Sequence, residues 1–235
     1  MKKKYTHIFF DLDHTLWDFE KNSNETLLEL VRHFKISDIH SFDENQFLEK
    51  FHKANYILWD QFNTDKISAE ELRNMRFQMA FDHHLEDVKH LINEFNQAYI
   101  NTCPHKGNLI PHAKEVLENL YSKYYKLFIL TNGFEHIQLT KLITSNIFHY
   151  FDEVYSVKDI GFKKPNPEYF NFVLKEQNID PSRCIMIGDS LEIDVLAAMN
   201  VGIDGVWYNP TNNYAPQSPT YIINDLRELF TIVDL

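Results

Sequence analysis

Short runs of apolar residues recur along the chain and are separated by polar segments that contain turn-forming residues. Several of these runs are apolar at consecutive positions rather than at alternating ones. That pattern fits strands covered on both faces, as in a parallel sheet. We expect six strands, at His7–Asp13, Lys126–Asn132, Glu153–Val157, Cys184–Asp189, Gly205–Asn209 and Tyr221–Asn224.

Segments with helical periodicity lie between the expected strands. His112–Tyr124 places Val116 and Leu120 on one stripe. Pro167–Asn178 begins with a proline, which suits a first helical turn, and Ser190–Gly202 ends with a glycine. The alternation of strand and helix predicts an α/β fold with a doubly wound, mainly parallel sheet.

The part of the chain that follows the first expected strand is helical in pattern throughout. We assign no strand between residues 18 and 102. An all-helical block of this size, placed after the first strand of an α/β core, is expected to form an inserted cap domain. We therefore predict a Rossmann-like catalytic core from residues 1–16 and 103–235, and a helical cap from residues 17–102.

The composition is that of a soluble globular protein with an acidic surface. Hydrophobic residues make up 44% of the 235 positions, and the formal net charge is -11. A negative surface repels nucleic-acid polymers and anionic membranes, so we expect neither as a partner. No apolar run approaches the length of a transmembrane helix. Cys103 and Cys184 lie far apart and outside any Cys-x-x-Cys motif, which favours reduced thiols in the cytoplasm.

Polar residues that can carry chemistry follow three of the expected strands. Asp11 and Asp13 end the first strand, Thr131–Gly133 ends the second, and Gly188–Asp194 follows the fourth. In an open α/β sheet, ligands bind outside the carboxyl ends of the strands, so these groups should face one crevice. Lys164 lies on a loop before a helix and could reach it. Each feature alone also fits a solvated pair, a turn, a helix cap or a surface lysine, but their combination predicts a catalytic site.

These motifs, in this order, resemble those of the haloacid dehalogenase superfamily. Asp11–Thr15 (DLDHT) resembles its Asp-x-Asp-x-Thr motif, and Thr131 in LTN resembles its second motif. Lys164, directly before a proline, resembles the third motif better than Lys163 does. Gly188–Asp194 (GDSLEID) resembles the fourth. The all-helical insert is similar to the helical cap of one branch of this superfamily.

The resemblance implies phosphatase chemistry rather than dehalogenation, because the superfamily's dehalogenases lack an acid at the position of Asp13. It implies that Asp11 is the nucleophile, which forms an aspartyl phosphate, and that Asp13 acts as general acid and then as general base. Thr131, Asn132 and Lys164 are implied to bind the phosphate.

The resemblance also implies a Mg²⁺ ion bound by the carboxylates of Asp11 and Asp189 and by the backbone carbonyl of Asp13. An all-oxygen ligand set suits this ion. Asp194 would fix the metal's water ligands or Lys164. These four aspartates and one lysine leave three negative charges, which would repel a phosphate dianion. Mg²⁺ reduces the sum to one, and a proton on Asp13 reduces it to zero, so we expect no activity without a divalent cation.

Longer stretches are similar to the YjjG-type pyrimidine 5′-nucleotidases, among them Asp11–Phe19, Thr131–Phe134 and Gly205–Asn209. This similarity implies that the partner is a small phosphorylated metabolite, a pyrimidine nucleoside monophosphate that is often non-standard. The motifs are equally compatible with a phosphosugar or phosphoglycolate phosphatase and with a phosphomutase. A catalytically silent binding protein on the same scaffold is the alternative outside enzymes. The oligomeric state is not indicated.

Aromatic residues of the expected cap and residues next to the nucleophile are candidates for substrate contacts. Tyr56, Trp59 and Phe62 recur every three residues on an expected helix. They fit either the packed core of the cap or, for Trp59, a platform on which a pyrimidine ring stacks. His14 and Trp17 follow the nucleophile closely and could also contact the substrate, although His14 equally fits a structural hydrogen-bonding role.

Overall fold

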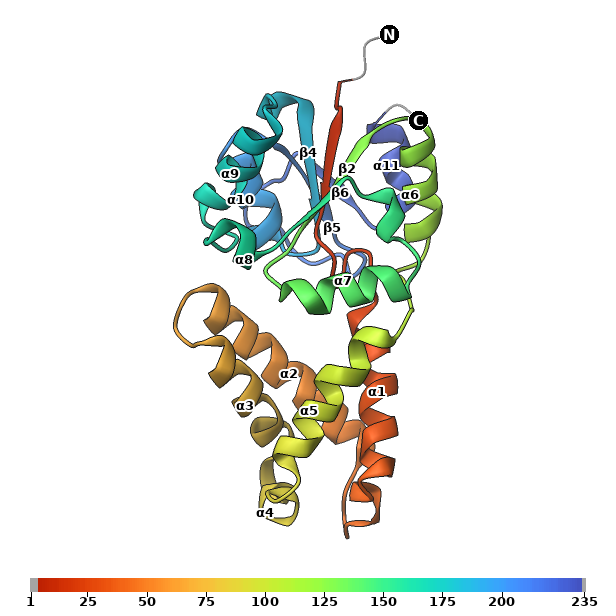
Figure 1. Ribbon diagram of the computed structural model, residues 1–235, viewed down its shortest axis with the longest axis vertical. Coiled ribbons are helices and arrows are strands. Elements are labelled where there is room, and N and C mark those ends of the chain that lie inside the picture. The colour runs from red at the N-terminus through yellow and green to blue at the C-terminus, as the bar shows by residue number, and fades with distance from the viewer. Residues whose placement is uncertain (1–3, 234–235) are drawn as a thin grey trace. The chain divides into compact units, whose positions relative to one another are not determined.

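The computed structural model describes residues 4–233, and a six-stranded sheet forms its α/β part (Figure 1). The strands are β1 (His7–Phe10), β2 (Lys126–Leu130), β3 (Glu153–Tyr155), β4 (Cys184–Gly188), β5 (Asp204–Tyr208) and β6 (Tyr221–Ile223). Their order is β3-β2-β1-β4-β5-β6, and each neighbouring pair runs parallel.

The helices of the described residues fall into two groups. Those that accompany the sheet are α6 (Ala113–Ser122), α7 (Glu135–Thr144), α8 (Val157–Ile160), α9 (Pro167–Gln177), α10 (Ala197–Met199) and α11 (Leu229–Ile232). Those of the segment between β1 and β2 are α1 (Phe19–His33), α2 (Glu44–Asn63), α3 (Ala69–Phe81), α4 (Leu85–Val88) and α5 (Ile92–Thr102).

Both faces of the sheet are covered, which explains the consecutive apolar residues of its strands. Phe9 of β1 lies opposite Phe128 of β2 and Met186 of β4, and all three belong to a buried cluster that includes residues of α9 and α10. Ile8 and Phe10 point to the other face because side chains alternate along a strand. They are also buried, and α6 and α11 lie on that side (Figure 1). The prediction of a doubly wound parallel α/β fold is confirmed.

The strand order reverses next to β1. After β1 the chain forms β2 and β3 on one side of it, and then crosses to form β4, β5 and β6 on the other side. Such a switch point opens a crevice at the carboxyl ends of the two strands between which the order reverses. Here those strands are β1 and β4, so the residues that directly follow them, Asp11 and Asp189, are placed at the crevice.

The first strand ends earlier than predicted, at Phe10 rather than at Asp13. The backbone N–H groups of Leu16 and Trp17 both donate to the carbonyl of Leu12, and His14 adopts a positive φ of 63°. These contacts turn the chain back on itself directly after the strand. Asp13 consequently lies in a tight loop, so the direction of its side chain is not set by the alternation of side chains along a strand.

The helix predicted over Ser190–Gly202 is not a regular α-helix. Leu191–Leu196 forms a π-helix, and only Ala197–Met199 continues as α10. The Ser190 hydroxyl accepts from the N–H of Ile193, and the Ser190 carbonyl accepts from those of Asp194 and Val195. Short π-helical turns are rare and are frequently found at functional sites. This one carries Asp194.

The described chain divides into two compact units. One combines the segment that ends at Asp18 with the segment that begins at Gly107, and the other is Phe19–Lys106. The boundaries expected from the sequence, at residues 17 and 102, differ from these by two and four residues. That the helical unit acts as a cap stays a prediction.

Aromatic side chains form the core of the helical unit. Phe77 lies against Phe51 and Phe95, with ring centroids 5.5 and 5.0 Å apart, and all three rings are buried. Helix α3 begins with a capping box, in which the Ser68 hydroxyl accepts from the N–H of Glu71 and the Glu71 carboxylate accepts from that of Ser68. The aromatic residues so abundant in this segment therefore mainly hold its helices together.

The three aromatic residues predicted to share a role on α2 do not share an environment. Tyr56 is 78% exposed, whereas Phe62 is buried. Trp59 is intermediate in exposure, and its ring contacts that of Phe62 edge-to-face, with ring centroids 5.5 Å apart. The expectation that all three pack into one core is wrong for Tyr56, because a spacing of three residues drifts around a helix with 3.6 residues per turn.

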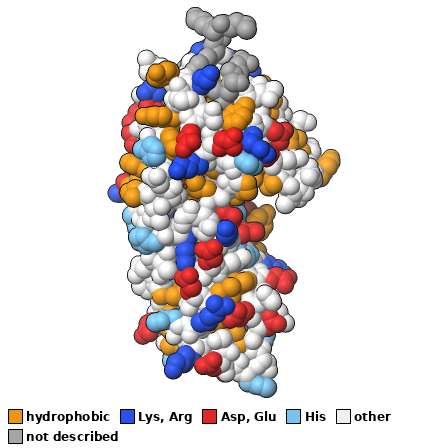
Figure 2. All heavy atoms as spheres, turned by 90° about the vertical axis from the view of Figure 1, so that its right-hand side faces the viewer, with side chains coloured by type: hydrophobic (Ala, Val, Ile, Leu, Met, Phe, Trp, Pro, Cys, Tyr) orange, Lys and Arg blue, Asp and Glu red, His pale blue; other side chains and the backbone are white. Residues whose placement is uncertain are grey.

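Acidic and basic side chains are interspersed on the face drawn in Figure 2. Elsewhere in the described chain, Lys106 and Glu29 form an ion pair at 2.7 Å, and Lys158 and Glu135 form another at 2.6 Å. Among residues 4–233, no helix combines the length and the apolar character that a membrane span requires.

Candidate active site

A buried lysine joins the ends of two strands to a helix. Lys164 is 1% exposed, and its ammonium group donates to Asp11 Oδ1 at 2.8 Å, to Asp194 Oδ1 at 2.6 Å and to the carbonyl of Leu130 at 2.6 Å. Burial alone would lower the pKa of Lys164, but the carboxylates of Asp11 and Asp194 raise it above its usual value. The side chain is therefore a fixed positive charge. This is the lysine that the sequence favoured over Lys163.

Asn132 determines where the backbone of Lys164 lies. Its side-chain amide donates to the carbonyl of Lys164 at 2.7 Å and accepts from the N–H of Lys164 at 2.8 Å. The paired bonds attach the loop before α9 to the end of β2. The side chain of Asn132, which we expected at the phosphate, thus positions the lysine. A role of its backbone at the phosphate stays a prediction.

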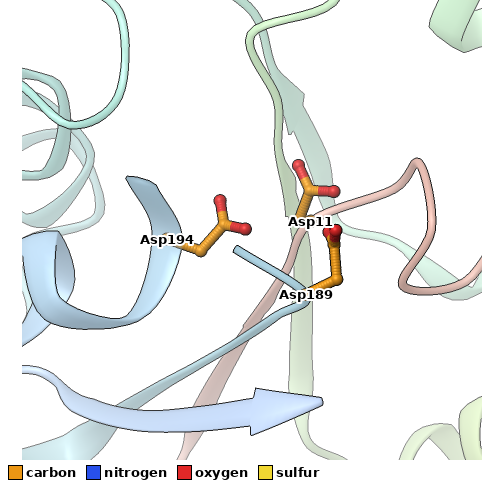
Figure 3. Close-up of side chains that lie close together, drawn as sticks. All are labelled: Asp11, Asp189 and Asp194. Atoms are coloured by element: carbon orange, nitrogen blue, oxygen red, sulfur yellow. The ribbon is translucent and has the colours of Figure 1, made fainter. Parts of the chain in front are cut away.

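Three carboxylates converge beside Lys164. Oxygen atoms of Asp11, Asp189 and Asp194 lie within 4.8 Å of one another, and Figure 3 shows the three side chains turned towards a common space. Burial, together with the neighbouring carboxylates, raises the pKa of Asp189 to about 7 and the pKa of Asp11 well above its usual value. Close carboxylates of this kind are stable in ionised form only when a cation offsets their charges.

The position of Asp189 depends on Thr15 and Trp207. The Thr15 hydroxyl accepts from the Asp189 N–H at 3.0 Å and donates to Asp189 Oδ1 at 3.2 Å. The indole N–H of Trp207, in β5, donates to the Asp189 carbonyl at 2.8 Å. The threonine of the DLDHT motif therefore orients a carboxylate from the far motif, and Trp207 was not foreseen in this role.

The donor set fits a hard divalent cation. Lys164 donates to one oxygen of Asp11 and Thr15 to one oxygen of Asp189, whereas both oxygens of Asp194 accept hydrogen bonds, from Lys164 and from the N–H of Ser190. Asp11 and Asp189 are therefore better suited than Asp194 to bind a metal ion directly. Asp194 holds the lysine, and its expected role behind a metal ion stays a prediction. All-oxygen sites of this kind suit Mg²⁺.

Close packing at Gly188 brings Asp194 into the cluster. A Cβ atom at Gly188 would lie 2.4 Å from the Cβ of Asp194. Only glycine at the end of β4 therefore lets the π-helix come close enough for Asp194 to reach Lys164.

The second aspartate of the loop, Asp13, has partners that the sequence analysis missed. Lys141 of α7 donates to Asp13 Oδ1 at 2.6 Å and to Oδ2 at 2.8 Å, and Gln138 donates to Oδ2 at 3.0 Å. Burial would raise the pKa of Asp13, but the ammonium of Lys141 outweighs it and holds the pKa below its usual value. The spacing of three between Gln138 and Lys141 places both on one face of the helix after the second motif, but it does not identify Asp13 as their partner.

Lys141 changes the charge balance that the sequence predicted. Four carboxylates now face two buried lysines, so two negative charges remain instead of three. One divalent cation neutralises them. A proton on Asp13 is therefore not needed for neutrality, and that part of the expectation is wrong because it left out Lys141.

Thr131 and Gln138 connect the second motif to this group. The Thr131 hydroxyl accepts from the N–H of Gly133 at 3.0 Å and from the Gln138 amide at 2.8 Å. Tyr169 supports the same segment, because its hydroxyl donates to the Thr131 carbonyl at 3.2 Å. The Gln138 amide thus links Thr131 to Asp13, and the role of Thr131 in binding the phosphate stays a prediction.

His14 and Trp17 take part in the turn after β1. The N–H of His14 donates to the Trp17 carbonyl at 2.9 Å. Trp17 is fully buried, and the Lys141 ammonium lies 4.5 Å from the centroid of its ring. Trp17 was expected as a possible substrate contact. In the structure the ring of Trp17 packs against the Lys141 ammonium, and no part of its side chain is exposed.

Fold and site together define a hydrolase whose carboxylates lie at the switch point of a doubly wound sheet. The haloacid dehalogenase-like hydrolase family matches residues 8–208, and the chain belongs to this family. The relatives it resembles include the pyrimidine 5′-nucleotidase PynA of Streptococcus pneumoniae, 30% identical over 98% of this chain and 95% of the relative.

Two further relatives cover nearly the whole chain. The pyrimidine 5′-nucleotidase YjjG of Escherichia coli is 29% identical over 96% of each chain. A crystal structure of the putative HAD-hydrolase YfnB of Bacillus subtilis, bound to magnesium and described as revealing interdomain movement, has a TM-score of 0.84. It is 28% identical and covers 99% of this chain and 100% of its own. The resemblance found in the sequence motifs is confirmed.

Proposed function

We propose that this protein is a Mg²⁺-dependent phosphomonoester hydrolase that acts on pyrimidine nucleoside 5′-monophosphates through an aspartyl phosphate. The observation that carries the proposal is that Asp11 and Asp13 have different charged neighbours. Asp11 lies beside Lys164 and the carboxylates of Asp189 and Asp194, whereas Asp13, two residues later, is held by a different lysine. A nucleophile and an acid–base group need such different environments.

The first half-reaction transfers the phosphoryl group to the enzyme. A carboxylate oxygen of Asp11 forms a bond to phosphorus while the bond between phosphorus and the leaving oxygen breaks. Asp13 gives that oxygen the proton that it took from water in the second half-reaction of the preceding turnover, so the product leaves as an alcohol. Lys164 offsets the negative charge of Asp11 and of the phosphoryl oxygens, and the Thr131 hydroxyl is proposed to bind one of those oxygens.

The second half-reaction restores the carboxylate. A water molecule attacks phosphorus and gives its proton to the ionised Asp13, while the bond between phosphorus and the Asp11 oxygen breaks. Inorganic phosphate then leaves. Mg²⁺, bound by Asp11 and Asp189, would supply charge neutralisation and orientation of the phosphate. Positioning is most of what phosphoryl transfer requires of a protein.

The helical unit, Phe19–Lys106, is proposed to act as a cap that determines the substrate. Two connections join it to the sheet-containing unit, one near Asp18 and one near Lys106. Movement about two short connections is a common way to exclude water from a reaction. The interdomain movement described for the YfnB structure supports this proposal.

The test is phosphate release across a panel of monoesters in the presence of Mg²⁺. The panel contains UMP, dUMP, dTMP, 5-halogenated dUMP, purine monophosphates, phosphoglycolate and hexose phosphates, with Asp11→Asn as the inactive control. We expect pyrimidine monophosphates to exceed the others at least about tenfold in kcat/KM, a transition-state preference of about 1.4 kcal/mol. Preference for phosphoglycolate or a sugar phosphate would retain the mechanism and reject the substrate. Identical behaviour of Asp11→Asn and the wild type would reject the mechanism.

A further inference from the structure

We propose that Lys141 and Gln138 are positioning residues that hold Asp13 where it protonates the leaving group, and that they determine how well the enzyme cleaves monoesters of poor leaving groups. The inference rests on the proposed function. Both residues lie on α7 three positions apart, so they share a face of the helix. Together they give the Asp13 carboxylate three hydrogen bonds, two from Lys141 and one from Gln138.

Lys141 is itself fixed on two sides. Its ammonium group forms the ion pair with Asp13 and lies against the ring of Trp17, 4.5 Å from the centroid. The backbone N–H of Trp17 donates to Leu12, so Trp17 belongs to the same turn as Asp13. A buried ammonium group is costly unless it is paired, and in residues 4–233 its ion-pair partner is Asp13. The lysine and the turn therefore hold each other in place.

Gln138 connects Asp13 to the second motif. One amide nitrogen donates to Asp13 Oδ2 at 3.0 Å and to the Thr131 hydroxyl at 2.8 Å. The side chain is buried, and its Oε1 accepts no hydrogen bond from any described residue. Burying Oε1 without a hydrogen bond costs free energy. The two hydrogen bonds that the amide nitrogen donates offset this cost and fix the orientation of the amide.

Gly133 makes room for this arrangement. A Cβ atom at that position would lie 1.9 Å from the Gln138 amide nitrogen. A glycine is thus required after Asn132, because a larger residue would prevent the Gln138 side chain from extending from α7 to Asp13. Two sequence motifs and one helix are joined by this contact.

Asp13 needs such support because it lies in a loop. Its side chain is 27% exposed, and the next residue, His14, has a positive φ. A general acid acts only from within hydrogen-bond distance of the leaving oxygen. Three donors on one carboxylate remove most of the alternative side-chain positions. A carboxylate has about four acceptor sites, so one remains available towards the substrate.

The leaving group distinguishes positioning from general support of the fold. An alkoxide leaves poorly without a proton, whereas 4-nitrophenolate leaves readily without one. Because kcat/KM reports the steps up to the first irreversible one, it includes departure of the leaving group and not the later attack of water. Loss of the correct Asp13 position should therefore lower kcat/KM for an alkyl phosphate far more than for 4-nitrophenyl phosphate.

The experiment measures kcat/KM of Lys141→Met with an alkyl phosphate monoester and with 4-nitrophenyl phosphate, at saturating Mg²⁺. We expect a fall of about 100-fold for the alkyl ester, within the range of acid–base contributions, and of less than about fivefold for the aryl ester. Lys141→Arg should recover most of the loss, since a guanidinium can also donate to both oxygens. Gln138→Met, similar in size, should show the same selectivity with a smaller loss.

The matched control is Lys126→Met. Lys126 is also paired with an aspartate, Asp152 at 2.5 Å, but it lies at the start of β2, away from the strand ends that carry the site. Its kcat/KM should match the wild type for both esters. If Lys141→Met does not fold, as judged by its thermal transition, the Gln138→Met and Lys141→Arg comparisons carry the test.

The outcomes separate this inference from the function on which it rests. Equal losses for the two esters, or no loss for either, would overturn the positioning role while the wild type still hydrolyses phosphate esters. A wild type that releases no phosphate from any ester would overturn the proposed function, and this inference with it. A selective loss that Lys141→Arg reverses is the expected result.

Discussion

The ammonium group of Lys164 lies 2.8 Å from the carboxylate of Asp11, although 153 residues separate the two in sequence. The same ammonium lies 2.6 Å from Asp194. Lys164 is therefore shared between the proposed nucleophile and a carboxylate that comes from the π-helix. It holds together two negative charges that would otherwise repel each other in a buried place.

Replacing this lysine should affect both catalysis and stability. For Lys164→Met we expect kcat/KM to fall by about 10³, because a fixed charge at the phosphoryl group is lost. In metal-free protein, the free energy of unfolding should fall by about 3 kcal/mol, since two buried carboxylates lose their partner. Steady-state kinetics and urea denaturation measure the two effects.

The neighbouring lysine offers a matched control for this variant. Lys163→Met removes the same charge one position earlier in the chain. We expect its kcat/KM and its free energy of unfolding to stay close to those of the wild type. If Lys163→Met lost as much activity as Lys164→Met, the assignment of the third motif to Lys164 would be wrong.

Removal of divalent cations should abolish activity and lower thermal stability. A ligand present at 100 times its Kd stabilises a folded protein by about 2.7 kcal/mol. We therefore expect Mg²⁺ to raise the Tm of the wild type, and to raise that of Asp189→Asn much less. Calorimetry in EDTA and then in excess Mg²⁺ tests this. Full activity after exhaustive chelation would contradict the metal-dependent mechanism.

The same carboxylates predict how stability depends on pH. Burial and neighbouring charges raise the pKa of Asp189 to about 7, whereas an aspartate in the unfolded chain titrates near 4. Between about pH 4 and pH 7 the folded, metal-free protein therefore binds more protons than the unfolded chain. The contribution of Asp189 to the free energy of unfolding should therefore fall as the pH rises through that window.

Comparison of the wild type with Asp189→Asn isolates this contribution. Urea denaturation in EDTA at several pH values between 5 and 8 should give a steeper loss of stability with rising pH in the wild type. Excess Mg²⁺ should reduce the difference, because the ion binds the ionised carboxylates and takes over the role of the proton. Parallel pH curves of the two proteins in EDTA would show that Asp189 titrates near its ordinary pKa.

The fold and the strand-end residues could be predicted because they follow local rules. Consecutive apolar residues mark strands buried on both faces, and parallel strands bring their carboxyl ends to one edge. That places Asp11, Thr131 and Asp189 together without knowledge of any distance. The limits of the elements were less certain, since the turn after Phe10 and the π-helix before α10 depend on tertiary contacts.

The contacts of α7 could not be predicted in this way. Gln138 and Lys141 read as polar positions of an amphipathic helix, and most such residues face solvent. They turn inward here because Gly133 leaves space for Gln138, and because Asp13 and Trp17 offer Lys141 a carboxylate and a ring. A pattern along one segment does not contain information about such partners in distant segments.

A single methyl group at Gly188 should disturb the site from behind. In Gly188→Ala the new Cβ would lie 2.4 Å from the Cβ of Asp194, an atom too close to the backbone to move aside by rotation. The π-helix must shift, which costs about 1–3 kcal/mol of stability and moves Asp194 away from Lys164. We expect lower stability, lower kcat/KM and a smaller rise in Tm on addition of Mg²⁺.

Gly107→Ala is the control, because its Cβ would meet only ordinary contacts, the nearest at 3.6 Å. Wild-type activity and stability in Gly188→Ala would mean that the position of Asp194 does not depend on this glycine.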